Sequence, residues 1–207
     1  MASEAAHFYE PSRGHGLRHD PFNAIIAPRP IGWVSTIDAH GRRNLAPYSF
    51  FNGFNYVPPI IGFSSIGRKD SLANAQLTRE FVWNLATRQL AEAMNATSAT
   101  VPHEVDEFEL ARLTPAPSRK VKPPRVLESP VNFECRVSQI LQLQCVDGTK
   151  IDSWVVFGEV VAVHIEKELI IEGVYQTAAA HPITRLGRMG DYAELRADAV
   201  FEMRRPR

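Results

Sequence analysis

The sequence predicts a mainly β fold, an antiparallel β-barrel with a few short helices. Apolar runs rich in strand-forming residues recur along the chain, and the clearest is VVFGEVVAVHI at 155–165. Asp147-Gly148, a strong hairpin signal, separates this run from a partly alternating run at 130–143. About six or seven such runs are joined mostly by hairpins, which favours a closed or partly closed barrel over a doubly wound sheet.

Length and composition indicate one globular domain with extensions. The chain has 207 residues, and we expect an N-terminal extension at 1–20, a domain at 21–195 and a tail at 196–207. Lys plus Arg and Asp plus Glu number 23 each, so no net field favours a nucleic-acid partner. No apolar run approaches the roughly 20 residues of a membrane span, and the N-terminus does not resemble a signal peptide. We therefore expect a cytoplasmic protein.

The first half of the chain should form three strands and a helix. We expect a strand from Ile31 to Thr36, a second at 44–52 and a third at 60–64. Pro47 implies a bulge or an edge position in the second strand. A helix should follow at 72–78, capped by Asp70 or Ser71.

The second half alternates strands with less regular segments. A strand is expected at 80–85, a helix at 86–99 and a Pro-rich excursion at 101–124 that contains a short helix and lies over a ligand. Gly158 should form a bulge in the long run, and 181–192 should be irregular. Segment 1–20 should wrap the domain or a partner subunit, anchored by Phe8 and Tyr9. Cys135 and Cys145 lack a C-x-x-C spacing and are expected to be buried, reduced thiols.

A compact anion site is indicated where the basic turn Arg68-Lys69 meets the start of the predicted helix. Either cation alone is more often a solvated surface charge. Hydroxyl groups at Ser35, Thr36 and Tyr48 would be brought near by the first two strands. No glycine-rich nucleotide motif and no H-E-x-x-H spacing is present.

Several ordered blocks resemble the flavin reductase-like family, whose fold is an FMN-binding split barrel of antiparallel Greek-key type. The resemblance covers roughly residues 20–195, although the family often has Thr where this chain has Ser71. The matching blocks are RPIGWVST at 29–36, NLAPYSFFN at 44–52, RKDS at 68–71 with Asn74, EFV at 80–82 with Asn84, GEVV at 158–161 with His164, and RLG at 185–187 with Tyr192.

The resemblance implies a homodimer with one FMN per subunit, NADH or NADPH as the hydride donor, and a flavin-dependent monooxygenase as a partner for the reduced flavin. The segment 47–50 would run along the flavin ring, with backbone N–H groups that stabilise the charge that hydride transfer creates. Residues expected to bind FMN are Arg29, Trp33, Ser35, Thr36, Pro47, Tyr48, Ser49, Phe50, Ser64, Arg68, Lys69, Asp70, Ser71 and Asn74.

Some residues have a structural interpretation beside the functional one. Trp33 either borders the ring or is a core aromatic, and only one of Phe50 and Phe51 should line the slot. His164 should be structural, whereas His181 is a candidate for the nicotinamide side. The acidic run 104–109 should be a solvated face. Alternative functions are an FMN-binding electron carrier without a productive nicotinamide site, and a barrel that binds haem or another nucleotide.

Overall fold

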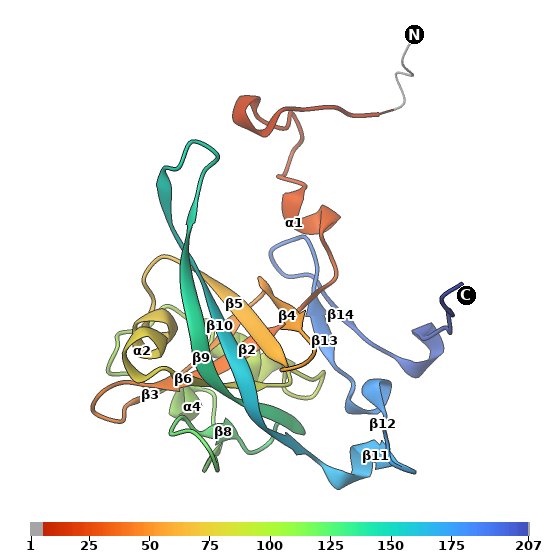
Figure 1. Ribbon diagram of the computed structural model, residues 1–207. Coiled ribbons are helices and arrows are strands. Elements are labelled where there is room, and N and C mark those ends of the chain that lie inside the picture. Colours follow the sequence, from red (N-terminus) through yellow and green to blue (C-terminus); the bar gives the residue numbers. More distant parts are fainter. Residues whose placement is uncertain (1–5, 207) are drawn as a thin grey trace.

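The computed structural model describes residues 6–206 and contains a seven-stranded antiparallel sheet (Figure 1). Each strand pairs antiparallel with its neighbours, as the predicted hairpin connections require. In spatial order the strands are β3 (Arg43–Tyr48), β2 (Gly32–Ile37), β6 (Glu80–Asn84), β9 (Val131–Gln144), β10 (Lys150–Ile165), β5 (Ile60–Ile66) and β4 (Phe51–Asn55).

The sheet curls until its two edges meet. The edge strands β3 and β4 are consecutive in the chain and are separated only by Ser49 and Phe50. From Tyr48 to Phe51 the chain takes three steps and spans at most about 11 Å, so the end of β3 and the start of β4 must lie close together. The prediction of a single strand at 44–52 is therefore wrong. The chain bends at Ser49–Phe50 and passes from one edge of the sheet to the other. We call this bend the seam. Pro47 lies in the edge strand β3, as its missing N–H predicted.

Aromatic and branched side chains fill the barrel. The rings of Tyr48 and Phe63 lie 4.8 Å apart across the seam, and Phe63 packs edge-on against Phe81. The pairing of β9 with β10 shifts register between Phe157 and Gly158, which confirms the predicted bulge. A Cβ atom at Gly158 would lie 2.4 Å from the Phe81 ring, so the core requires glycine there.

The α-helices are short and lie outside the barrel. They are α1 (Phe22–Ile25), α2 (Asp70–Thr78), α3 (Ala91–Ala96) and α4 (Glu107–Leu110). The helix expected at 86–99 is wrong in extent, because Thr87 instead pairs with Pro182 as an extended bridge. The capping prediction is also wrong: Lys69 is the N-cap of α2, and its side chain makes no capping hydrogen bond.

Residues near the C-terminus pair with Arg29–Pro30 in a second sheet. Its strands are β1 (Arg29–Pro30), β13 (Ile183–Arg185) and β14 (Tyr192–Glu194), in that order. The expectation that 181–192 is irregular is therefore wrong in part. These strands have two or three residues each, too few to show a period. Two short pairs, β7 (Pro115–Ala116) with β8 (Arg125–Val126) and β11 (Ile170–Ile171) with β12 (Val174–Tyr175), complete the strands.

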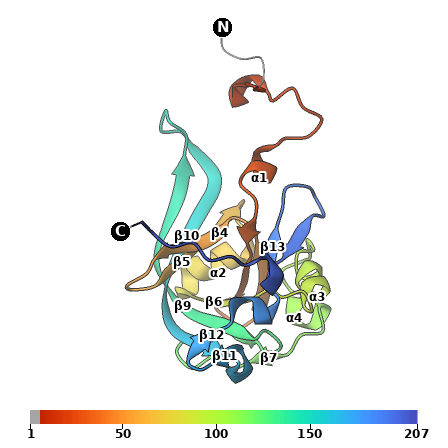
Figure 2. The same ribbon diagram turned by 90° about the vertical axis from the view of Figure 1, so that its right-hand side faces the viewer.

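Short 3-10 helices, η1 (Pro11–Arg13), η2 (Lys167–Leu169), η3 (Thr177–Ala180) and η4 (Ala197–Ala199), lie in the connections and near the termini. The N-terminal arm and the tip of the β9–β10 hairpin extend from the same end of the barrel (Figures 1 and 2). Phe8 is 83% exposed, so the arm does not wrap its own domain, whereas wrapping of a partner remains a prediction. Cys135 is buried as expected, but Cys145 is exposed at the β9–β10 turn, and neither is disulfide-bonded.

Candidate functional site

A pocket of about 400 Å³ lies beside the seam, between β3 and the start of α2. We call it the basic pocket. It brings together six of the residues expected to bind FMN: Pro47, Tyr48, Arg68, Lys69, Asp70 and Ser71. The remaining lining residues are Asn44, Ala46, Thr97, Ser98, Ala99, Thr100, Val101 and Glu107.

The start of α2 gives this pocket its positive character. Arg68 and Lys69 are exposed and immediately precede the helix, and the Arg68 guanidinium donates to the Gln76 side chain at 3.0 Å. The N-cap residue is Lys69, and its side chain makes no capping hydrogen bond. The N–H groups of the first turn of α2 therefore receive no side-chain acceptor from the N-cap. A dianionic group would meet two cations and the positive end of the helix dipole here.

His103 joins the segment that borders the pocket to the base of α2. Its Nδ1 lies 2.9 Å from the Asp70 carboxylate, and its Nε2 lies 3.4 Å from that of Asp38. The hydrogen bond with Asp70 is the main reason that the pKa of His103 is raised. Since His103 follows Thr97–Val101 closely in the chain, this contact holds the lining segment over the pocket.

A buried polar network forms the floor of the basic pocket. The Asn44 amide donates to the hydroxyls of Thr36 and Ser71, at 3.1 and 2.8 Å, and Asn74 donates to Thr36 at 3.1 Å. Thr36 is fully buried, so the structure places it and Asn74 beneath the pocket. These side chains hold Ser71 and Asn44 in position at the surface of the pocket.

Ser35 and Trp33 are also fully buried. The Ser35 hydroxyl donates to the carbonyl of Pro124, and the Trp33 indole N–H donates to the Thr97 hydroxyl at 3.0 Å. Trp33 belongs to a core cluster with Leu45. Trp33 therefore supports the pocket from within through Thr97, and this placement favours the core interpretation, whereas Ser35 is tied to Pro124, which does not line the pocket.

Glu107 lines the basic pocket although the acidic run 104–109 was expected to be a solvated face, and that expectation is wrong at this residue. The carboxylate is buried and accepts the backbone N–H of Leu45 at 3.1 Å. Burial raises the pKa of Glu107, and the negative charges of Asp70 and Asp106 act in the same direction. Its sequence context, DEFEL, gives no sign that the middle of the run turns inward.

A second pocket of about 250 Å³ continues along the seam, and we call it the seam pocket. It shares Pro47, Tyr48 and Ser98 with the basic pocket and adds Ser49 from the bend. Within residues 6–206, neither Ser49 nor Phe50 donates its backbone N–H to a protein acceptor. Pro47 has no N–H, so the donors on this wall come from the residues after it. The seam pocket is further lined by Ile31, Met94, Asn95, Arg185, Met189 and Tyr192.

The remaining predicted residues lie in an outer pocket on the β4 side of the seam. It contains Arg29, Ser49, Phe50 and Ser64. The Arg29 guanidinium lies 5.6 Å from the centre of the Phe50 ring and donates to the carbonyls of Asn23 and Leu186, the latter at 3.0 Å. Phe51 turns to stack on Trp83. The structure therefore separates Arg29 and Ser64 from the basic turn.

His164 and His181 both pair with carboxylates. His164 Nε2 lies 2.6 Å from buried Glu134, outside all of these pockets, which agrees with the structural role expected for it. His181 Nδ1 lies 2.6 Å from the Glu194 carboxylate. No cluster of His, Cys, Asp and Glu suited to a metal ion occurs in the described part of the chain. No helix among residues 6–206 is long and apolar enough to cross a membrane.

Comparisons with known proteins agree with this geometry. The family model described as "Flavin reductase like domain" matches residues 26–184. This chain belongs to the flavin reductase-like family. A protein of Aquifex aeolicus is 39% identical over 169 residues, covering 79% of this chain and 83% of the relative.

Solved structures confirm the split-barrel fold. Nitrilotriacetate monooxygenase component B from Bacillus cereus is 31% identical and superposes with a TM-score of 0.85, covering 97% of this chain and 100% of that one. A Shewanella frigidimarina protein described as having a split barrel domain superposes with a TM-score of 0.77 at 21% identity, covering 90% of this chain and 89% of that one. The mainly β split barrel expected from the sequence is therefore confirmed.

Proposed function

We propose that this protein binds FMN in the basic and seam pockets and uses it as an NADH- or NADPH-dependent flavin reductase. The observation that carries the proposal is the continuity of these pockets. A basic turn at a helix start lies at one end, and the bend with its available N–H groups lies at the other. Family membership supports the same assignment, since the matched region contains every residue of both pockets except Arg185, Met189 and Tyr192.

The donor set fits the chemistry of FMN. Arg68, Lys69 and the first turn of α2 would hold the phosphate, because charge-assisted hydrogen bonds favour a dianion. The N–H groups of Ser49 and Phe50 would orient the polar edge of the flavin ring along the seam. When bound, FMN supplies the acceptor at N5 for a hydride from the nicotinamide. The protein's own task is to align the two rings and to exclude water, which needs no nucleophilic side chain.

The proposal extends to partners. The Bacillus cereus relative is named as a component of a monooxygenase, and we propose that this chain likewise supplies reduced flavin to a monooxygenase. We also propose a homodimer, in which the protruding arm at 6–21 would pack against the second subunit rather than its own barrel.

An absorption spectrum and an anaerobic titration test the function. We expect the purified protein, after incubation with FMN and gel filtration, to retain a flavin spectrum that NADH or NADPH bleaches. Protein that does not bind FMN and oxidises neither nucleotide in its presence would contradict the proposal. Protein that binds FMN but is not bleached by either nucleotide would instead be an electron carrier.

Tyr48→Phe tests whether the seam wall binds FMN through backbone N–H groups and not through the Tyr48 hydroxyl. The Tyr48 hydroxyl is buried without a hydrogen-bond partner, although Ser65 and Ser71 lie near it, and burial raises the pKa of the phenol. Removing an unsatisfied hydroxyl should leave the free energy of unfolding unchanged or raise it by up to about 1 kcal/mol. FMN affinity, measured by fluorescence titration, should change by less than about threefold. A tenfold loss would instead show that the phenol contacts the flavin.

A further inference from the structure

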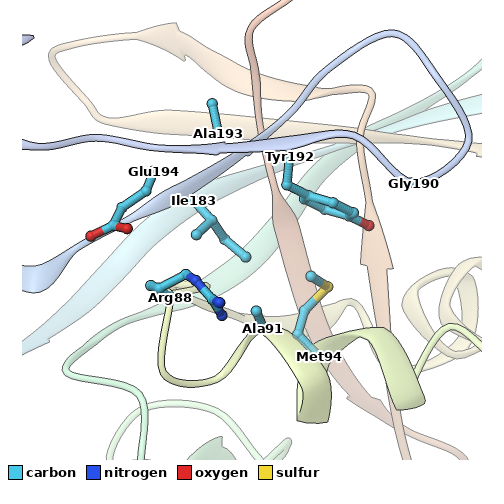
Figure 3. Close-up of a pocket in the computed structure, with 8 residues that line it drawn as sticks. All are labelled: Arg88, Ala91, Met94, Ile183, Gly190, Tyr192, Ala193 and Glu194. Carbon is cyan, nitrogen blue, oxygen red and sulfur yellow. The ribbon is translucent and has the colours of Figure 1, made fainter.

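A fourth pocket of about 450 Å³ lies between the α3 region and the β13–β14 hairpin (Figure 3). We call it the hairpin pocket, and it contains none of the residues expected to bind FMN. Its lining residues are Arg88, Ala91, Met94, Ile183, Gly190, Tyr192, Ala193 and Glu194.

The hairpin pocket adjoins the proposed flavin site. Met94 and Tyr192 line both this pocket and the seam pocket. Since the seam pocket in turn shares Pro47 and Tyr48 with the basic pocket, the three form one series along the protein surface. A nicotinamide dinucleotide folded so that one ring lies in the seam pocket and the other on the hairpin-pocket side of the Met94–Tyr192 wall would place its phosphates farther into the hairpin pocket.

The hairpin pocket is lined by one arginine and one carboxylate, and the arginine is available to an anion. Arg88 is exposed, and within residues 6–206 its side chain has no ion-pair partner within 4.0 Å. Figure 3 shows its guanidinium pointing toward Ala91, whereas the Glu194 carboxylate points the other way. That carboxylate is held by His181 at 2.6 Å. An arginine without a carboxylate partner suits a phosphate, to which its planar group can donate two hydrogen bonds.

The other surfaces favour a flat, apolar ring. Met94 and Tyr192 converge at one end of the pocket, with Ile183 and Ala91 beside them (Figure 3). The Arg185 guanidinium lies 4.7 Å from the centre of the Tyr192 ring and donates to the carbonyls of Arg188, Met189 and Asp191, at 2.6 to 2.8 Å. These contacts hold the aromatic wall in place. A thioether and a fixed phenol ring are suitable partners for an aromatic base.

We propose that the hairpin pocket binds the adenylate half of the hydride donor, with its base on the Tyr192–Met94 wall and its phosphate at Arg88. The inference rests on the proposed function, because it assumes that a nicotinamide dinucleotide reacts at the seam. It assigns Arg88 to donor binding alone, with no part in holding FMN. ADP, which lacks the nicotinamide, should therefore compete with the donor for this pocket.

Arg88→Ala in the FMN-loaded protein tests the assignment. We expect the KM for the preferred nucleotide, NADH or NADPH, to rise tenfold or more with little change in kcat, since the charge contact binds ground state and transition state alike. The dissociation constant of ADP, measured by calorimetry, should rise by a similar factor, while that of FMN stays unchanged. Arg119→Ala is the matched control, because it removes an exposed arginine side chain that lines none of these pockets.

The possible failures are distinguishable. A wild-type protein that oxidises NADH or NADPH, together with an Arg88→Ala variant that matches the Arg119→Ala control in KM and in ADP binding, would overturn this inference and leave the proposed function standing. A wild-type protein that oxidises neither nucleotide would overturn both. An Arg88→Ala variant that loses FMN affinity would also overturn the inference, because it would place Arg88 in the flavin site.

Discussion

Replacing Arg68 and Lys69 together by alanine is expected to weaken FMN binding by about a hundredfold or more. Each charge-assisted contact to a phosphate contributes on the order of 1.5 to 3 kcal/mol, and the exposure of both side chains favours the lower end of that range. Two contacts then give about 3 kcal/mol, or two orders of magnitude in the dissociation constant. Fluorescence titration with FMN measures this directly.

The sequence offers a matched control for this pair. Arg119 and Lys120 are also adjacent and exposed, but neither lines the basic pocket. Arg119→Ala with Lys120→Ala should leave FMN affinity within about twofold of the wild type. Because exposed charges are screened by salt, wild-type binding should also weaken as ionic strength rises, and the Arg68/Lys69 variant should respond less. An unchanged FMN dissociation constant in that variant would show that the phosphate binds elsewhere.

Replacing Glu134 by alanine should lower the free energy of unfolding by about 3 kcal/mol or more. This carboxylate on β9 is fully buried and accepts backbone N–H groups of Arg119, Lys120 and Val121, at 2.8, 2.5 and 3.2 Å. Its loss leaves three donors without an acceptor and frees the loop that covers this face of the sheet. Urea denaturation measures the effect, with exposed Glu159→Ala on β10 as the control.

The same contacts make stability depend on pH. Burial alone would raise the pKa of Glu134, but hydrogen bonds from the Arg119 and Lys120 amides and from His164 outweigh it and hold the pKa below its ordinary value. Because the folded-state pKa is lowered, this stabilisation is present above the unfolded pKa of about 4.3 and is lost as pH falls through the folded value. Glu134→Gln should therefore lose less stability between pH 6 and pH 3 than the wild type. Equal losses would show that other groups set the acid sensitivity.

Strands and turns were predictable where the local sequence is consistent with the fold. The β9–β10 hairpin followed from Asp147-Gly148, and the bulge followed from a glycine within a strand. The prediction failed where tertiary pairing overrides propensity. Ala86 and Thr87 follow a strand and precede an Ala-rich helix, yet they extend to pair with 182–183. No local pattern signals a partner almost a hundred residues away.

The candidate site was predictable in its chemistry but not in its arrangement. The basic turn, its helix and the bend were all identified, because each combines residue types suited to an anion or a flat ring. The pocket also contains the segment Thr97–Val101 and Glu107. The sequence placed the excursion 101–124 over a ligand, but it named none of these residues as a contact. Arg29, Trp33 and Ser35 were grouped with the site, but the structure places Arg29 in the outer pocket and the other two in the core.

The sequence by itself determined that the chain is an antiparallel barrel with a cationic turn before a helix, since periodicity, turn residues and charge order are local properties. Only the tertiary structure decided that Ser49 and Phe50 bridge the two edges of the sheet. Curling a seven-stranded sheet until its first and last strands meet is a property of the whole barrel, and it makes the seam the place where backbone N–H groups remain available beside a basic helix start.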